Sequence, residues 1–303
     1  MRVIFSKQVP LQFYIFPALV AAMLLLLSYR IGNCISTAQQ HTIYTNHTSA
    51  IIAPSICQIS ADETVVKCGT STTLSVDNGI TNPTWSTGAT SSSITVTTSG
   101  QYWWQYVDSS RNTVTNGNFS NGNTGFTSQY NYIAPNGSTG SFGALSAEGY
   151  YSISTNPRNT HTQFASFGDH TSGTGKMMII NGSSQNNVTV WAQNITVEPN
   201  TSYIFSIWGA SAHSSNPAKL AFSINGTLLG TIQFSSTTGA WQNFTIEWTS
   251  NSSTVASIGI VNQNTITNGN DFTLDDILFA PVCRKYFNVS LYPNPPKPDI
   301  TSS

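Results

Sequence analysis

The residues best suited to chemistry in this sequence are aromatic rings and amides rather than charged groups. Trp191 and Gln193 alternate with Val190 along one predicted strand, so they are expected to face away from the core. Trp208 is expected to face the same way on the next predicted strand. Flat aromatic faces can stack on the C–H side of a sugar ring, while amides bind its hydroxyls. We therefore predict that Trp191 and Trp208 lie across a concave groove, with Gln193 beside them.

Further aromatic and amide side chains extend this candidate set. Four tyrosines lie in sequence that resembles loops, where binding residues are common: Tyr130, Tyr132, Tyr150 and Tyr151. Trp241 is a further ring, and Asn187 and Asn264 are further amides. The alternative for each ring is core packing, because tryptophan and tyrosine bury large apolar areas. An exposed ring beside open polar groups would favour binding.

The carboxylates do not form a pattern that is typical of an enzyme. The predicted second domain, residues 113–281, carries seven: Glu148, Asp169, Glu198, Glu247, Asp271, Asp275 and Asp276. A glycosidase needs two carboxylates that converge on one bond, and no such pair is evident here. Asp169-His170 has no accompanying nucleophile motif, and the chain lacks a GxSxG sequence. We predict a protein without catalytic residues.

Short alternating runs broken by Asn, Gly and Pro predict an all-β fold with a large second domain. The strands expected between residues 113 and 281 are 177–180, 188–197, 203–208, 219–224, 228–232, 241–248, 256–261 and 272–279. Asn225-Gly226 is a two-residue turn of the kind that closes a β-hairpin. This pattern favours a two-sheet jelly roll.

A smaller β-sandwich is predicted over residues 54–112. Its expected strands are 64–68, 72–76, 93–97 and 101–107. Trp85 occupies the position of a core tryptophan, and Tyr102 that of a tyrosine corner in an immunoglobulin-like domain. Trp104 stands where such a domain has its second cysteine, so no bridge between the sheets is expected.

Several motifs between residues 113 and 281 resemble carbohydrate-binding modules of the galactose-binding-like jelly-roll type. They are Asn116-Gly117-Asn118-Phe119, Gly168-Asp169-His170-Thr171, Met177-Met178, Asn181-Gly182, Pro199-Asn200-Thr201, Tyr203 and Leu274-Asp275-Asp276-Ile277. The versions most similar to this chain occur in secreted multidomain proteins of Bacteroidetes-type bacteria. Residues 85–104 are similar to the immunoglobulin-like and PKD-like spacers of bacterial surface proteins.

The same resemblance implies a structural calcium ion. Its ligands would be Asp169, Asp275 and carbonyl groups near Gly117, and Ser120 stands where the family has a glutamate. Calcium prefers six to eight such oxygen ligands. The alternative is that these aspartates cap turns.

The two ends of the chain indicate export. Residues 1–38 have the basic start, apolar run and small residues of a cleaved signal peptide, and an uncleaved membrane anchor is the alternative. Residues 39–53 are a predicted linker. Residues 282–303 are predicted to form a Pro-rich tail. Tyr292-Pro293-Asn294-Pro295 resembles the start of a type IX secretion sorting domain, so the tail is a truncated signal or an accidental match.

The cysteines are interpreted in an oxidising compartment. Cys57 and Cys68 flank an expected turn at Asp62-Glu63, so we predict a disulfide between them, with Cys283 left outside it. The alternative is a pair of buried thiols. No CxxC or Cys/His cluster indicates a zinc site.

Composition limits the partners. Only 8% of residues are charged, and 11 Lys and Arg nearly balance 12 Asp and Glu, so a nucleic-acid partner is excluded. We expect a secreted or surface-displayed glycan-binding or adhesion protein that depends on secretion machinery and contacts a membrane only through an uncleaved signal. The alternatives are a structural adhesin without a small ligand, or the accessory binding region of a larger glycoside hydrolase.

Overall fold

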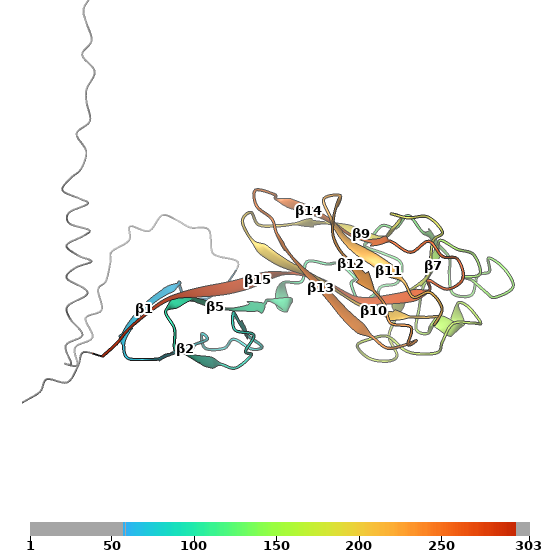
Figure 1. The fold of residues 1–303 in the computed structure, drawn as a ribbon. Coiled ribbons are helices and arrows are strands. Elements are labelled where there is room, and N and C mark those ends of the chain that lie inside the picture. The colour runs from blue at the N-terminus through green and yellow to red at the C-terminus, as the bar shows by residue number, and fades with distance from the viewer. Residues whose placement is uncertain (1–56, 58, 295–303) are drawn as a thin grey trace, which may run out of the picture.

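The computed structural model describes Cys57 and residues 59–294, which fold into two β-sandwiches (Figure 1). The predicted signal peptide, the linker and residues 295–303 lie outside the described residues. In chain order the elements are β1 (Glu63–Cys68), β2 (Thr72–Ser75), β3 (Thr84–Trp85), β4 (Ser93–Val96), β5 (Gly100–Val107), the 3₁₀ helix η1 (Ser109–Arg111), β6 (Asn131–Tyr132), β7 (Tyr150–Ser154), the 3₁₀ helix η2 (Pro157–Asn159), β8 (Met177–Asn181), β9 (Thr189–Thr196), β10 (Ser202–Ser211), β11 (Lys219–Ile224), β12 (Thr227–Gln233), β13 (Gln242–Thr249), β14 (Val255–Asn262) and β15 (Phe272–Tyr292).

The predicted all-β class is confirmed. In the part of the chain that the structure describes, no helix has the length and apolar character needed to cross a bilayer.

The larger sandwich consists of two facing sheets. One has the order β13-β10-β15-β8-β7-β6, and the other has the order β12-β11-β14-β9. Aromatic side chains fill the space between them: Phe205 packs 4.7 Å from Phe222, and Tyr203 stacks on Phe279 at 4.9 Å. The hairpin between β11 and β12 turns at Asn225 and Gly226, both with positive φ, as the Asn-Gly pair predicts.

A second, smaller core covers part of the outer face of the first sheet. Strand β8 is buried on both sides, because Met178 and Ile180 face the main core while Met177 and Ile179 pack outward. Leu145 and Phe164, from the long segments around β7, cover these outward side chains together with Ala212 and neighbouring rings. The outer face therefore stays accessible only farther along the sheet, over β10 and β13.

The smaller sandwich contains the N-terminal strands and the end of β15. Strand β1 pairs with β15 in parallel, β5 pairs with both β15 and β3, and β2 pairs with β4. Trp85, Trp104 and Phe287 are buried at its centre. The hydroxyl of Tyr102 donates a hydrogen bond to the carbonyl of Thr98 at 3.0 Å, which matches the expected corner.

Strand β15 belongs to both sandwiches. Its first part pairs with β10 and β8, and its second part pairs with β5 and β1 (Figure 1). The sequence-based boundary at residue 282 falls inside this strand, and residues 282–292 complete the smaller sandwich instead of forming a tail. Residues after this boundary are still rich in Val, Phe and Tyr, which favour strands. The prolines that follow them led to the prediction of a tail.

The predicted disulfide between Cys57 and Cys68 is wrong. Cys57 bonds to Cys283, with their Cα atoms 5.3 Å apart across 226 residues of sequence. The expected turn at Asp62-Glu63 is absent, because Glu63 begins β1 opposite Phe287 of β15. Parallel pairing of β1 with β15 places the segment before β1 beside Cys283, and a short-range loop argument does not anticipate this.

Candidate functional site

The accessible outer face of the larger sandwich carries a stripe of neutral side chains. On β10 the core residues Tyr203, Phe205 and Ile207 alternate with Ile204, Ser206 and Trp208, which point to this outer face. The neighbouring strand β13 places Thr245 opposite Ser206 and Asn243 opposite Trp208. Regular alternation on both strands thus assembles one face from separate parts of the sequence.

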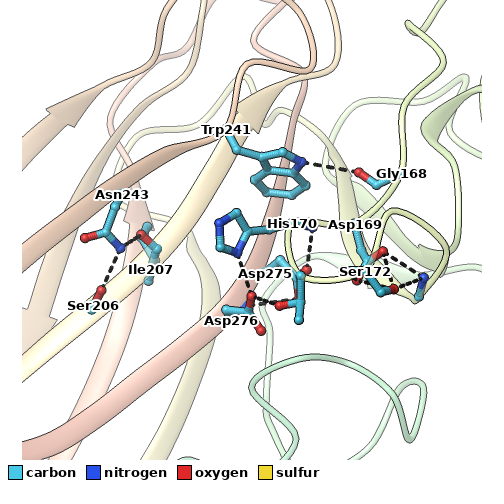
Figure 2. A network of polar contacts seen from close by, with 12 residues as sticks. Gly168, Asp169, His170, Ser172, Ser206, Ile207, Trp241, Asn243, Asp275 and Asp276 are labelled. Atoms are coloured by element: carbon cyan, nitrogen blue, oxygen red, sulfur yellow. Dashed lines mark hydrogen bonds and ion pairs between the residues drawn. The ribbon is translucent and has the colours of Figure 1, made fainter. Parts of the chain in front are cut away.

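Three rings form an aromatic corner at one end of this face. Trp208, which is partly exposed, stacks on the imidazole of His170 with centroids 3.7 Å apart and planes 16° apart. Trp241 meets the same imidazole edge-on, at 5.8 Å and 69°. Figure 2 shows Trp241 above His170, with its indole N–H donating to the carbonyl of Gly168 at 3.3 Å.

Two aspartates at a bulge of β15 hold His170 in place. Nδ1 of His170 lies 2.7 Å from a carboxylate oxygen of Asp276, and the backbone N–H of His170 donates to Asp275 at 3.0 Å (Figure 2). The β10–β15 register shifts between Ser206 and Trp208, and Asp276 has a φ of 44° there. This irregularity directs both neighbouring carboxylates toward the segment that contains His170.

Polar groups with unused hydrogen-bonding capacity lie next to the aromatic corner. The amide nitrogen of Asn243 donates to the Ser206 hydroxyl at 2.9 Å and to the carbonyl of Ile207 at 3.2 Å. No described residue accepts the Ser206 hydroxyl proton or donates to the Asn243 amide oxygen. Both groups can therefore bind hydroxyls of a ligand on this face.

The face continues into a cavity of about 590 Å³ between the two sandwiches. Ile204, Ser206, Thr245 and Leu278 line it from the larger sandwich. The smaller sandwich supplies mainly neutral residues from β3, β5, η1 and the adjoining loops: Thr81, Asn82, Thr84, Gln105, Tyr106, Val107, Asp108, Ser109 and Ser110. We call the aromatic corner together with this cavity the inter-sandwich groove.

Arg284 bridges the two sandwiches near the groove. Its guanidinium donates to the side-chain oxygen of Gln105 at 2.8 Å and to the carboxylate of Glu247 at 3.1 Å. It also lies over the ring of Trp103, 4.6 Å from the centroid. These contacts join β5, β13 and β15, so the relative position of the groove walls is fixed by more than the shared strand.

Trp191 is a core residue, so the predicted pair of Trp191 and Trp208 does not form. Its ring is fully buried and packs against Phe126 and Phe205. The pairing of β9 with β14 shifts between Ile260 and Val261, so that Val190 and Trp191 both face the core. Trp191 alternates in step with the core residues Ile195 and Val197, whereas the prediction counted from Val190.

Gln193 has a structural contact that the groove prediction did not include. Its side-chain oxygen accepts from the backbone N–H of Thr115 at 3.1 Å, and its amide donates to the Thr115 carbonyl at 2.6 Å. The amide thus holds the incoming segment against β9. Gln193 does not lie with Trp208.

The four candidate tyrosines lie in strands or beside them, not in open loops. Tyr130 and Tyr151 are buried, and their hydroxyls bond to the Ser183 N–H and to Asn123. Tyr150 of β7 is half-buried and packs in the smaller core. Tyr132 is 44% exposed and lies 5.5 Å from Tyr151, far along the sheet order from β10, so it is a separate candidate surface.

The residues expected to hold calcium are engaged in other contacts. Burial would raise the pKa of Asp169, but hydrogen bonds from Ser172 and Gly175 outweigh burial and lower it. Asp275 accepts the N–H groups of His170 and Asp276, and the Gly117 carbonyl accepts the N–H of Ile277. These oxygens already accept hydrogen bonds from the protein, and the calcium ion that the resemblance implies here stays a prediction.

Most residues of the groove were not among those predicted from the sequence. Ser206 and Asn243 share the parity of Trp208 on their strands, so alternation was a signal that could have found them. The role of His170 depends on a bulge in β15, and that of Tyr106 on pairing between β5 and β15, so neither has a local sequence signal.

Comparison with known proteins gives low-identity structural likenesses. No protein-family model and no curated protein matches the chain. Among solved structures, a family 16 carbohydrate-binding module is 16% identical, with 55% of this chain and 99% of that one covered and a TM-score of 0.34. The CBM22-1 xylan-binding domain of Paenibacillus barcinonensis Xyn10C is 12% identical, with 55% and 91% covered and a TM-score of 0.35. TmCBM61 in complex with β-1,4-galactotriose is 13% identical, with 56% and 97% covered and a TM-score of 0.36.

Proposed function

We propose that the protein is a secreted or surface-displayed glycan-binding protein without catalytic activity, and that the inter-sandwich groove binds the glycan. The observation that carries this proposal is the partly exposed Trp208, held by His170 beside the exposed Asn243 amide, with the nearly buried Ser206 hydroxyl in the adjoining cavity wall. Ligand sites generally combine apolar surface with a few placed polar groups, and this arrangement provides both.

The chemistry of the groove favours a neutral, hydroxyl-rich ligand. Ile204, Leu278 and Tyr106 provide apolar surface, and most of the other lining side chains carry hydroxyls or amides. Asp108 is the one charged residue in that lining, and Arg111 lies 3.4 Å from it. A phosphorylated or strongly charged ligand would find little charge to neutralise its own.

The arrangement around His170 does not support hydrolysis. A His–Asp pair activates a nucleophile only when a hydroxyl or thiol lies within hydrogen-bonding reach of the imidazole. No described Ser, Thr or Cys side chain bonds to the His170 ring, whose partner is Asp276 and whose face is covered by Trp208. We assign His170 to positioning Trp208.

Export is supported by the disulfide together with the N-terminal sequence. A bond between Cys57 and Cys283 is of the kind that persists in oxidising compartments. The basic and apolar start of the chain is typical of a secretion signal. An adhesive role at the cell surface follows if the bound glycan belongs to another cell or to a matrix.

A glycan array probed with the secreted full chain tests the proposal. We expect binding to neutral oligosaccharides, and Trp208→Ala should weaken it at least about fivefold because a stacking contact worth about 1 kcal/mol is lost. Tyr132→Ala is the matched control, since it removes an exposed ring from the other end of the sheet. Far-UV circular dichroism checks the fold of both variants.

Two results would overturn the proposal. Loss of binding in Tyr132→Ala with retention in Trp208→Ala would move the site to the Tyr132 surface. If the intact chain bound no glycan, the remaining hypothesis would be a structural adhesin without a small ligand.

A further inference from the structure

A group of buried oxygen atoms lies at the ends of four strands, away from the groove. Glu148 lies just before β7, Asn181 ends β8, and Asn270 and Asp271 lie just before β15. The strand register puts these ends side by side, since Asn181 pairs with Tyr150 and Ile180 pairs with Phe272. Asn262, at the end of β14 in the other sheet, reaches this place through hydrogen bonds to the carbonyls of Ser183 and Gln185.

The contacts of Gly182 place the side chains of Asn270 and Asp271 next to each other. Its N–H donates to the Asp271 carboxylate, and a Cβ atom at this glycine would lie 2.3 Å from the amide nitrogen of Asn270. The N–H of Gly149 donates to the carbonyls of Asn181 and Gly182 at 3.2 and 3.0 Å. The amides of Asn262 and Asn270 both donate to the carbonyl of Asn264.

Each of the five side chains leaves a buried oxygen without a donor from any described residue. The atoms are Oε2 of Glu148, Oδ1 of Asp271, and the amide oxygens of Asn181, Asn262 and Asn270. Asn262 and Asn270 are fully buried, and Asn181 and Asp271 are 5% and 6% exposed.

The orientation of the three amides is fixed by their nitrogens. Asn181 donates to the carbonyl of Leu145 at 2.7 Å, and Asn270 donates to that of Asn264 at 2.9 Å. Asn262 donates to three carbonyls. Rotating any of these amides would place an oxygen against a carbonyl oxygen, so the unpartnered atoms are oxygens by necessity.

The cluster contains two carboxyl groups, those of Glu148 and Asp271. No described Lys or Arg forms an ion pair with either carboxylate. Buried acceptors without a donor each cost about 1 to 3 kcal/mol, and buried charges cost more.

We propose that these five oxygens bind a calcium ion that joins the ends of β7, β8, β14 and β15. Calcium takes six to eight oxygen ligands, mixes carboxylate with amide and carbonyl oxygens, and accepts irregular geometry. Its two positive charges match the two carboxylates. The ion would tie both sheets together at this edge, and it would lie at a place distinct from Asp169, Asp275 and Gly117.

Metal content and thermal unfolding of the full chain test this site. After EDTA treatment and removal of the chelator, we expect calcium chloride to restore about one bound ion per chain. At a calcium concentration about 100-fold above Kd, Tm should rise by about 5 to 10 °C. Magnesium should raise it less, because magnesium demands near-octahedral geometry.

Variants test which residues are responsible for the calcium-dependent rise in Tm. Glu148→Gln with Asp271→Asn should abolish the calcium-dependent rise in Tm, whereas the control Asp169→Asn with Asp275→Asn should keep it. If the first double variant does not fold, Asp271→Asn alone should weaken calcium affinity at least about tenfold, because one ligand charge is lost. These readouts do not involve glycan, so they stand or fall independently of the proposed function.

Three results would overturn the proposal. They are an intact chain whose Tm does not respond to calcium, a response that is lost only in the Asp169 and Asp275 control, and unchanged calcium affinity in Asp271→Asn.

Discussion

The indole of Trp208 lies flat on the imidazole of His170, and Asp276 holds that imidazole through its Nδ1 atom. One face of Trp208 is therefore committed to the protein. The tryptophan has little freedom to turn, so a ligand that stacks on the rest of the indole meets a surface already in place. Pre-organisation of this kind lowers the ordering cost of binding.

The two tryptophans of the sequence-based pair should now behave differently. Trp191→Ala should lower the free energy of unfolding by about 3 to 5 kcal/mol, because it empties a buried site beside Phe205. Trp208→Ala should lower it much less while weakening glycan binding. Urea denaturation and glycan titration of both variants separate these effects, and equal stability losses would contradict the assignment.

The affinity of the groove should grow with the length of the oligosaccharide. Ile204 and Trp208 are four residues apart along β10, a distance of about 13 Å, which is longer than one sugar ring. Tyr106→Ala at the far end should therefore weaken binding of long oligosaccharides and leave monosaccharide binding unchanged. Calorimetry over a length series measures this, and equal losses at every length would place Tyr106 outside the site.

The disulfide between Cys57 and Cys283 should contribute strongly to stability. Closing a loop of 226 residues is worth about 5 kcal/mol in the chain-entropy model. We expect a double serine variant at these positions to unfold at a lower temperature. Mass spectrometry of a non-reduced digest should show a peptide linking the two cysteines. A Cys57–Cys68 peptide would contradict the assigned pairing.

Asp275 should make the protein less stable as the pH rises. Burial, with the charge of Asp276 adding to it, raises the pKa of Asp275 to about 7, whereas an unfolded aspartate titrates near 3.9. The native state thus holds a proton that the unfolded chain releases. The contribution is complete below about pH 4 and is lost as pH rises through about 7.

Asp275→Asn imitates the neutral side chain and should remove this contribution. Compared with the original protein, the variant should gain stability between pH 5 and pH 8, by no more than about 4 kcal/mol. Taking the difference at each pH cancels the contributions of the other titrating groups. Parallel stability curves for the two proteins would contradict the assigned protonation.

Local patterns predicted much of this fold. Alternation located most strands, the Asn225-Gly226 pair located a hairpin, and Trp85 and Tyr102 occupy the expected places in the smaller sandwich. The parity of Trp208 holds because the facing stretch of β10 alternates regularly toward the core. These features depend on neighbouring residues, so a sequence carries them directly.

The features that the sequence did not yield depend on pairing between distant strands. At the register shift between β9 and β14, Val190 and Trp191 both enter the core, so alternation counted from Val190 placed Trp191 on the wrong face. Cys283 meets Cys57 only because β1 lies parallel to β15. His170 joins the site through a second bulge, so the groove became visible only once the sheets were assembled.

The unbroken course of β15 has a mechanical consequence. From Phe272 to Tyr292 it is one strand, lined by β10 in the larger sandwich and by β5 and β1 in the smaller one. Tension on a glycan held at Trp208 would enter β10, cross its ladder into β15, and travel along that strand to the bonded Cys283. The two sandwiches would then carry the load as one rigid unit and not as two domains joined by a flexible linker.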